Sequence, residues 1–228
     1  LAYSSTEGRV EKQASAAIGS GELALVITGI RQMTSTIRAY ELRSEDGRDL
    51  PLAEAGAHIE VPALLANGIL VTRQYSLTTD VGRRNVYEIA VRCESGGRGG
   101  SQAIHDTWQL GTLLRASLPI NHFPLHADSR PAVLIAGGIG ITPFRSILIE
   151  TIRTGGLAYR VGVFYANRRP RDAAFLEEFR HLAEQAHEPI CMAVQEVSDE
   201  RVSPSAPEGS PGLSLRSGVT DARSPLAV

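Results

Sequence analysis

The chain has 228 residues, a length that accommodates one large domain or two small ones. Hydrophobic residues make up 43% of it and charged residues 21%, which is ordinary globular usage and excludes wholesale disorder and collagen-like repeats. The formal net charge of −2 excludes the strongly basic field through which proteins bind nucleic-acid phosphates.

No segment of the sequence has the character of a membrane span or of a secretory signal. The longest run of apolar residues and glycine, Ala132–Ile141, has ten residues, whereas a membrane-spanning helix needs about 20. The first residues are polar and lack an apolar core. We therefore expect a soluble, cytoplasmic protein that binds neither membranes nor nucleic acid.

The cysteines and histidines of the sequence do not form a metal-binding pattern. The two cysteines, Cys93 and Cys191, are too few for a four-thiolate iron–sulfur cluster or a cysteine-rich zinc site. The six histidines, which show no paired metal-ligand spacing, are His58, His105, His122, His126, His181 and His187. We therefore predict no metal site.

The first half of the chain has the pattern of short strands. Residues 1–20 are small and polar, and we expect a disordered lead-in there. Residues 21–126 contain runs of strand-forming residues separated by turn signals. The expected strands are Glu22–Ile30, Thr36–Arg43, Ile69–Leu77, Val86–Arg92 and Leu113–Leu118. This spacing predicts a small antiparallel barrel or sandwich.

Residues 131–197 have a different pattern, in which the expected strands and helices alternate. The expected order is strand Ala132–Ala136, helix Pro143–Arg153, strand Arg160–Ala166, helix Asp172–Ala186 and strand Ile190–Val197. This alternation predicts a parallel sheet covered by helices, with charged residues such as Glu177 and Glu178 on the solvated helix face. Residues 198–228 are rich in serine, proline and glycine, and we expect a disordered tail.

The strongest local motif is AVLIAGGIGITP, Ala132–Pro143. An apolar strand runs into Gly137, Gly138 and Gly140, and a helix follows with Thr142 as the expected N-cap. Glycines let backbone amides approach a ligand closely, and a helix N-terminus attracts phosphate. We favour dinucleotide or phosphate binding over a purely structural turn, because the strand and the helix lie on the correct sides of the loop.

Two further motifs are weaker on their own. In RQYSL, Arg73 and Tyr75 share one face of a strand, which suits either an anionic planar ligand or an ordinary solvated barrel face. In GGRGGSQAIHD, Ser101 is placed to cap a short helix that runs through Trp108. This segment suits either a second anion site or a mobile hairpin loop.

Taken together, RQYSL, RGGS and GGIGITP resemble the ferredoxin–NADP reductase superfamily in their order and intervals. The chain is most similar to the reductase components of Rieske-type oxygenases, of the phthalate dioxygenase and vanillate O-demethylase kind. NHFPL at Asn121–Leu125 strengthens this resemblance, which spans Gly21–Val197. The family implies a six-stranded antiparallel flavin-binding barrel, followed by a nicotinamide-nucleotide domain with a parallel sheet.

The resemblance also implies roles for individual residues. Arg73 would pair with the flavin phosphate, which Gly99, Gly100 and Ser101 would wrap. Tyr75 and Ser76 would contact the isoalloxazine, and the backbone of Ala90 and Val91 would meet the edge of its rings. The residues implied to seat the nucleotide are Gly137, Gly138, Gly140, Ile141 and Thr142. Ser76 and Thr142 are the candidate catalytic residues.

The implied reaction transfers hydride from NADH or NADPH to the flavin and passes electrons to a ferredoxin or Rieske-type oxygenase partner. The short RGGS loop is similar to that of FMN-binding members, whereas FAD-binding relatives need more chain. Nucleotide preference depends on Asn167–Arg171, where arginines would suit a 2′-phosphate although relatives of this type mostly use NADH.

The sequence departs from the family in its last part. It contains no Cys-Gly-Pro motif and no plant-type ferredoxin segment with spaced cysteines, and the nucleotide domain reads as truncated after about three strands. The alternatives are therefore a stand-alone flavin or ferric reductase, or a flavin-binding fragment with impaired catalysis.

Overall fold

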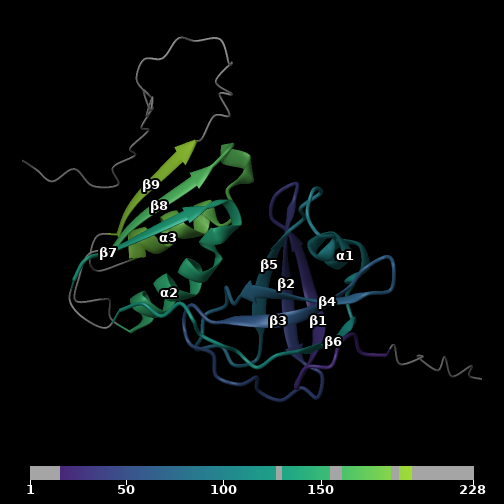
Figure 1. The fold of residues 1–228 in the computed structure, drawn as a ribbon. Coiled ribbons are helices and arrows are strands. Elements are labelled where there is room, and N and C mark those ends of the chain that lie inside the picture. The colour runs from purple at the N-terminus through teal and green to yellow at the C-terminus, as the bar shows by residue number, and fades with distance from the viewer. Residues whose placement is uncertain (1–15, 127–129, 155–160, 186–189, 197–228) are drawn as a thin grey trace, which may run out of the picture.

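The structure is a computed structural model that describes residues 16–126, 130–154, 161–185 and 190–196. Most of the expected lead-in at 1–20 and all of the expected tail at 198–228 lie outside these residues. Figure 1 shows two parts side by side, one built of antiparallel strands and one of parallel strands with helices.

Six antiparallel strands make up the first part. They are β1 (Leu23–Gln32), β2 (Ile37–Ser44), β3 (His58–Leu64), β4 (Leu70–Ser76), β5 (Tyr87–Arg92) and β6 (Leu113–Ala116). Their hydrogen-bonded ladders form a four-stranded sheet in the order β5-β2-β1-β6 and a two-stranded sheet of β3 and β4. An isolated bridge between Leu77, just after β4, and Ile89 of β5 joins the two sheets, and a second one pairs His58 of β3 with Ile120, which follows β6.

Both antiparallel sheets enclose one hydrophobic core. Alternate residues of each strand point inward, so Leu25 and Ile27 of β1 pack with Ile59 and Val61 of β3. Helix α1 (Gly100–Thr107) closes one side through Ile104, which is fully buried. The expected barrel is therefore found in part, as six antiparallel strands curled around a core but divided into two ladders.

The sequence patterns did not predict strand β3. Pro62 lies within it, and proline is confined to strand edges because it has no N–H to donate. Glu60 donates its N–H to Ser117 on the side away from β4, and the nitrogen of Pro62 points to that same side. The missing N–H therefore leaves the β3–β4 ladder intact.

The second part is a parallel sheet in the order β7-β8-β9, made of β7 (Ala132–Gly137), β8 (Val161–Asn167) and β9 (Ile190–Glu196). Helices α2 (Thr142–Arg153) and α3 (Leu176–Gln185) pack against Leu134 and Val163 in a second core. Val133, Ile135 and Phe164 point to the opposite face and are more than half exposed. The expected parallel sheet with helices is thus confirmed for the described residues.

Helix α3 begins later than the pattern predicts. Residues Pro170–Asp172 form a short 3-10 turn, and Phe175 adopts a φ of 61°. A bulky residue in this left-handed region interrupts helical geometry, so the regular helix begins only at Leu176. None of the helices in the described ranges is long and apolar enough to cross a membrane.

Candidate functional site

The first part of the candidate site is a contact between strand β4 and the beginning of helix α1. A Cβ atom built on Gly100 would lie 2.8 Å from Cζ and 2.9 Å from Nη2 of Arg73. The guanidinium therefore lies directly against the backbone of the first helical residue, in space that a larger residue would fill. A full positive charge and the partial charge of a helix N-terminus meet here, which is an arrangement suited to an anion.

Ser101 does not cap this helix, contrary to our expectation. The N-cap is Gly99, whose φ of 78° is accessible to glycine without steric cost, and no side chain caps the helix. The Ser101 Oγ accepts a hydrogen bond from the N–H of Glu94 at 3.1 Å. Ser101 therefore closes the glycine-rich loop on itself, and the first N–H groups of the helix are not used by a side-chain cap.

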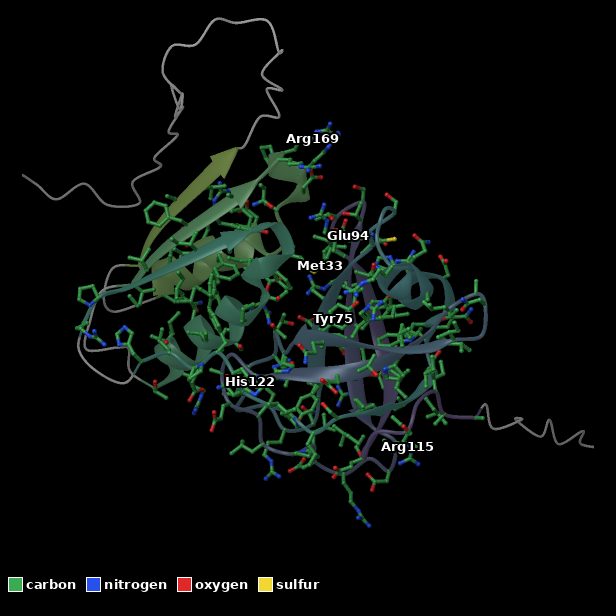
Figure 2. All side chains as sticks on the ribbon, viewed as in Figure 1. Met33, Tyr75, Glu94, Arg115, His122 and Arg169 are labelled. Carbon is green, nitrogen blue, oxygen red and sulfur yellow. The ribbon has the colours of Figure 1, made fainter. Side chains whose placement is uncertain are left out.

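Tyr75 lies on the same face of β4 as Arg73. Burial raises the pKa of Tyr75 to about 12, although the positive charge of Arg73 acts in the opposite direction. The phenol is therefore neutral at physiological pH and able to donate a hydrogen bond. Ser76 is half-buried at the end of the strand, opposite His58. Figure 2 shows Tyr75 near the centre of the molecule, where the two parts meet.

Ala90 and Val91 of β5 present their backbone groups to opposite sides. Thr78 donates its N–H to the carbonyl of Glu88 on the β4 side, and Cys93 donates to Thr36 on the β2 side. Alternation along the strand directs the backbone of Ala90 toward β4 and that of Val91 toward β2. The carbonyl of Val91 also lies 2.9 Å from Nε2 of His105. Of the two residues, only Ala90 directs backbone groups toward Tyr75 and Ser76.

The second part of the candidate site is the glycine loop at the end of β7. Gly138–Ile141 forms one 3-10 turn between β7 and α2, and Gly138 has a φ of 51°. No heavy atom lies within 4 Å of a Cβ built on Gly137 or Gly140, and both residues are exposed. The loop therefore presents an open backbone surface at the N-terminus of α2, as a phosphate-binding turn does.

Thr142 and Ile141 have their side chains turned into the fold. Thr142 is the first residue of α2 rather than its N-cap, and its hydroxyl donates to the carbonyl of Ile139 at 3.0 Å. Pro143 occupies the first turn, as the sequence indicates. Ile141 is fully buried, so it offers a ligand only its backbone.

The structure brings the two parts of the candidate site together through strand β5. A Cβ built on Gly138 would lie 3.3 Å from Nη1 of Arg92, the last residue of β5. The Nε of Arg92 pairs with Glu94 Oε1 at 3.0 Å, and Glu94 is the residue that donates to Ser101. Arg92, which sequence reasoning missed, thus lies between the glycine loop and the loop beside Arg73.

Sequence reasoning also missed an ionic network that joins α2 to the antiparallel strands. Arg145 of α2 donates to the carbonyl of Thr78, which is 67 residues away in the chain, and pairs with Glu178 of α3 at 2.7 Å. Glu178 was expected on a solvated helix face; its side chain is 36% exposed, and it also forms this ion pair, which was not expected. No local periodicity marks such a contact, because its members come from distant segments.

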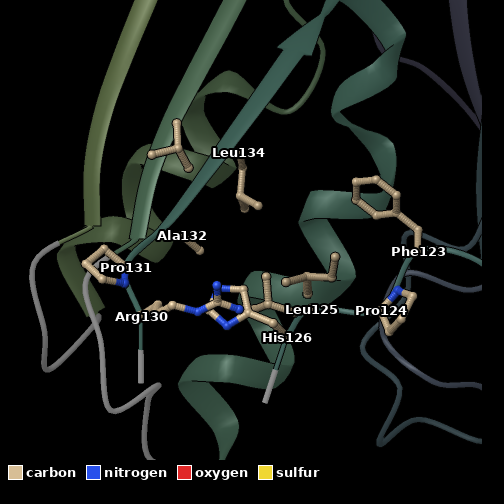
Figure 3. Close-up of a pocket in the computed structure, with 10 residues that line it drawn as sticks. Phe123, Pro124, Leu125, His126, Arg130, Pro131, Ala132 and Leu134 are labelled. Carbon is tan, nitrogen blue, oxygen red and sulfur yellow. The ribbon is translucent and has the colours of Figure 1, made fainter. Parts of the chain in front are cut away.

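A cavity of about 420 Å³ lies away from this site, at the opposite end of β7 (Figure 3). Its lining includes Phe123, Leu125, Arg130, Leu134 and Ile147. Gly137 lies at the other end of the six-residue strand, about 10 Å along β7 from Leu134, the nearest residue of the lining, at ~3.3 Å per residue. The cavity is therefore separate from the glycine loop.

Known sequences similar to this chain are oxidoreductases. Residues 134–216 match the family model of the oxidoreductase NAD-binding domain. Vanillate O-demethylase oxidoreductase from Acinetobacter baylyi is 45% identical over 123 residues, which are 54% of this chain and 37% of that protein. Phthalate dioxygenase reductase from Burkholderia cepacia is 39% identical over 158 residues, which are 69% of this chain and 47% of that protein. The chain thus spans less than half the length of these two curated relatives.

Solved structures with a similar fold include one of the relatives found by sequence. The structure of phthalate dioxygenase reductase, described as modular for electron transfer from pyridine nucleotides to [2Fe-2S], superposes with a TM-score of 0.65 and 35% identity. It covers 81% of this chain and 54% of that one. The FAD/NAD-binding domain of a Vibrio cholerae nitric oxide dioxygenase shares the fold, with a TM-score of 0.69 at 22% identity. It covers 86% of this chain and 81% of that one. The chain therefore shares its fold with ferredoxin–NADP reductase-like oxidoreductases, and its residues 134–216 match an oxidoreductase NAD-binding domain.

Proposed function

We propose that the chain is an NAD(P)H-dependent flavoprotein reductase that holds FMN on its antiparallel strands and passes electrons to a ferredoxin or oxygenase component. The observation that carries the proposal is the placement of Arg73 against Gly100, in contact through Arg92 and Glu94 with the glycine loop at Gly138. On this proposal, the two features would hold two anionic cofactors close to each other, as stacked cofactors require.

The residues around the contact of Arg73 with Gly100, the first feature, fit a flavin phosphate. The missing Cβ of Gly100 leaves room beside the Arg73 guanidinium, and a charge-assisted hydrogen bond from arginine suits a phosphate oxygen. Tyr75 and Ser76 would lie along the flavin rings, and the backbone of Ala90 would meet their edge. The short loop at Gly99, Gly100 and Ser101 favours FMN over FAD, because it is similar to the loop of FMN-binding members and FAD-binding relatives need more chain.

The residues of the glycine loop at the end of β7, the second feature, fit a dinucleotide. The backbone at the exposed Gly137 and Gly140 and the half-buried Gly138 would bind the pyrophosphate, and Thr142 and Ile141 would hold the loop in shape. Arg168, Arg169 and Arg171 follow β8 and are exposed (Figure 2 labels Arg169). We propose NADH as the preferred nucleotide, with NADPH as the alternative that these arginines would favour.

When bound, the two cofactors supply hydride transfer and the release of single electrons, and the chain supplies orientation and electrostatics. Arg73 neutralises phosphate charge, and Tyr75 keeps its proton at physiological pH. The half-buried Tyr75 and the mostly buried strand β5 would exclude water from one side of the rings. We assign no general base, because hydride transfer needs none. We also propose that the protein is cytoplasmic, with a flavin-binding domain at residues 21–126 and a nucleotide-binding domain at residues 131–197.

Anaerobic reduction tests the proposal. The chain would be reconstituted with FMN, freed of excess flavin, and mixed without oxygen with NADH or with NADPH. We expect loss of the visible flavin absorbance with at least one nucleotide. A chain that retains FMN but is bleached by neither nucleotide would be a flavin-binding fragment, and the reductase proposal would be wrong. Rapid reduction of ferric chelates or free flavin, without a ferredoxin or oxygenase partner, would favour the stand-alone alternative.

A further inference from the structure

We infer that Arg145 is a positioning residue, which holds the glycine loop at a fixed separation from strands β4 and β5. This inference rests on the proposed function, because it assigns a role in placing one cofactor site against the other. Arg145 lies three residues after Thr142, within the first turn of α2. Its partner Thr78 lies two residues after Ser76. The contact therefore links the immediate supports of both candidate catalytic residues.

Arg145 uses several of its donors at once. Its Nη1 donates to the carbonyl of Thr78 and lies 3.7 Å from Glu88 Oε1, and its Nε donates to Glu178 Oε2 at 2.7 Å. The guanidinium carbon lies 5.3 Å from the ring centroid of Phe175. A planar guanidinium bound at several points has a defined orientation, which the single flexible ammonium group of a lysine would not reproduce.

The acidic partners are themselves held in place. Glu88 Oε1 accepts a hydrogen bond from the hydroxyl of Thr78 at 2.8 Å, and Glu88 Oε2 lies 3.4 Å from Nη2 of Arg31. Arg31 also lies 3.5 Å from Glu178, so the four charged side chains form a closed network. The side chains of Arg145 and Glu88 are only 18% and 14% exposed. Water screens the Arg145–Glu88 pair less than it screens an exposed ion pair, whereas Arg31 and Glu178 are 52% and 36% exposed.

Other contacts also hold the two parts of the molecule together. Ser146 accepts a hydrogen bond from the N–H of Gly56 at 3.0 Å. Ile37 and Ala90 of the antiparallel strands pack in the same hydrophobic cluster as Phe144 and Ile147 of α2. Loss of Arg145 is therefore expected to loosen the alignment of the two parts without separating them. That outcome would slow hydride transfer while leaving flavin binding in place, because transfer depends steeply on the approach of the reacting atoms.

The test compares Arg145→Met with Arg180→Met. Methionine keeps much of the arginine volume and removes the donors. The control removes an exposed arginine whose ion pair with Glu177, at 2.6 Å, lies entirely within α3. Both variants would be loaded with FMN and reduced anaerobically at saturating nucleotide. We expect Arg145→Met to lower the limiting reduction rate by about tenfold or more, with FMN affinity within about twofold of the parent and Arg180→Met unchanged.

A second readout needs no cofactor. Hydrogen exchange of the flavin-free chain would be followed in peptides that cover residues 76–88 and 142–153. We expect Arg145→Met to raise exchange in both segments together and Arg180→Met in neither, with Arg145→Lys between parent and Arg145→Met. If Arg145→Met does not fold, Glu178→Gln removes the charge of one partner with little change of shape and serves in its place.

The outcomes separate the two proposals. A parent protein that binds FMN but is not bleached by either nucleotide contradicts the proposed function, whatever the exchange results. A parent that is reduced normally, together with an Arg145→Met variant of equal rate and equal exchange, overturns the positioning role alone. Loss of FMN binding in Arg145→Met also overturns that role, since it would make the network a support of the flavin site itself.

Discussion

Arg73 and Gly100 are in direct contact, although they lie on different elements and 27 residues apart. The arginine side chain occupies the position that any side chain at residue 100 would need, with Cζ 2.8 Å from the site of a Cβ. Glycine at position 100 therefore determines where the guanidinium rests, and the guanidinium determines the charge at the N-terminus of α1. This contact and its counterpart at Gly138 can each be tested by substitution.

Replacing Gly100 with alanine should displace Arg73 and weaken FMN binding. The added methyl group would meet the far end of a flexible side chain, so the fold should accommodate it while the guanidinium moves away. We expect the FMN dissociation constant, measured by fluorescence titration, to rise by about tenfold, as expected for the loss of one charge-assisted hydrogen bond. Gly96→Ala is the matched control, because no atom lies within 4 Å of a Cβ there. Equal effects of both variants would contradict the prediction.

Removing the arginine itself should have a larger effect on the same constant. Arg73→Ala loses a charge-assisted contact of about 1.5–3 kcal/mol, which corresponds to roughly a 10- to 150-fold rise in the FMN dissociation constant. Arg115→Ala, on an exposed position of β6, should leave the constant unchanged (Figure 2). Unchanged FMN affinity in Arg73→Ala would remove the role assigned to this residue.

In the glycine loop between β7 and α2, Gly138→Ala should impair nucleotide binding and spare flavin binding. The φ of 51° is unfavourable for alanine, and the methyl group would lie 3.3 Å from Arg92. Gly47→Ala is the control, because its φ of 76° imposes a similar backbone cost in a turn with no neighbour within 4 Å. Both variants should lose about 1–2 kcal/mol of unfolding free energy, but only Gly138→Ala should raise the nucleotide concentration for half-maximal reduction. A rise in both would indicate general destabilisation.

The stability of the fold should decrease above about pH 10 because of its buried tyrosines. Burial raises the pKa of Tyr75 to about 12 from an ordinary value of 10.0. Between these values the unfolded chain has lost the phenolic proton and the folded chain has kept it, so unfolding becomes easier as the pH rises. Urea unfolding at several pH values would measure this slope.

Tyr75→Phe should make that slope shallower, and it should leave the pH dependence below pH 9 unaltered. Some slope should remain, because burial also raises the pKa of Tyr87 and of Tyr165 to about 12. An identical slope in Tyr75→Phe and in the parent would contradict the burial of this phenol.

Several parts of the fold could be predicted because their signals are local. The apolar run that ends in Gly137 and the helical spacing of Phe144, Ile147 and Leu148 identify β7 and α2 to within a residue. The predicted cap residues failed for a related reason. A hydroxyl near a helix start also has carbonyl and amide partners in the same loop, and Ser101 and Thr142 bind those instead.

The sequence by itself determined the order of the strands and helices apart from β3, the two glycine loops and the resemblance to a reductase family, because periodicity and motif spacing act over short stretches of chain. Only the tertiary structure decided that Arg73 rests on Gly100, that Arg92 reaches Gly138, and that Arg145 joins Thr78 to Glu178. These contacts join side chains from segments far apart in the chain. Their partners are selected by how the two cores pack against each other, and no local pattern records that packing.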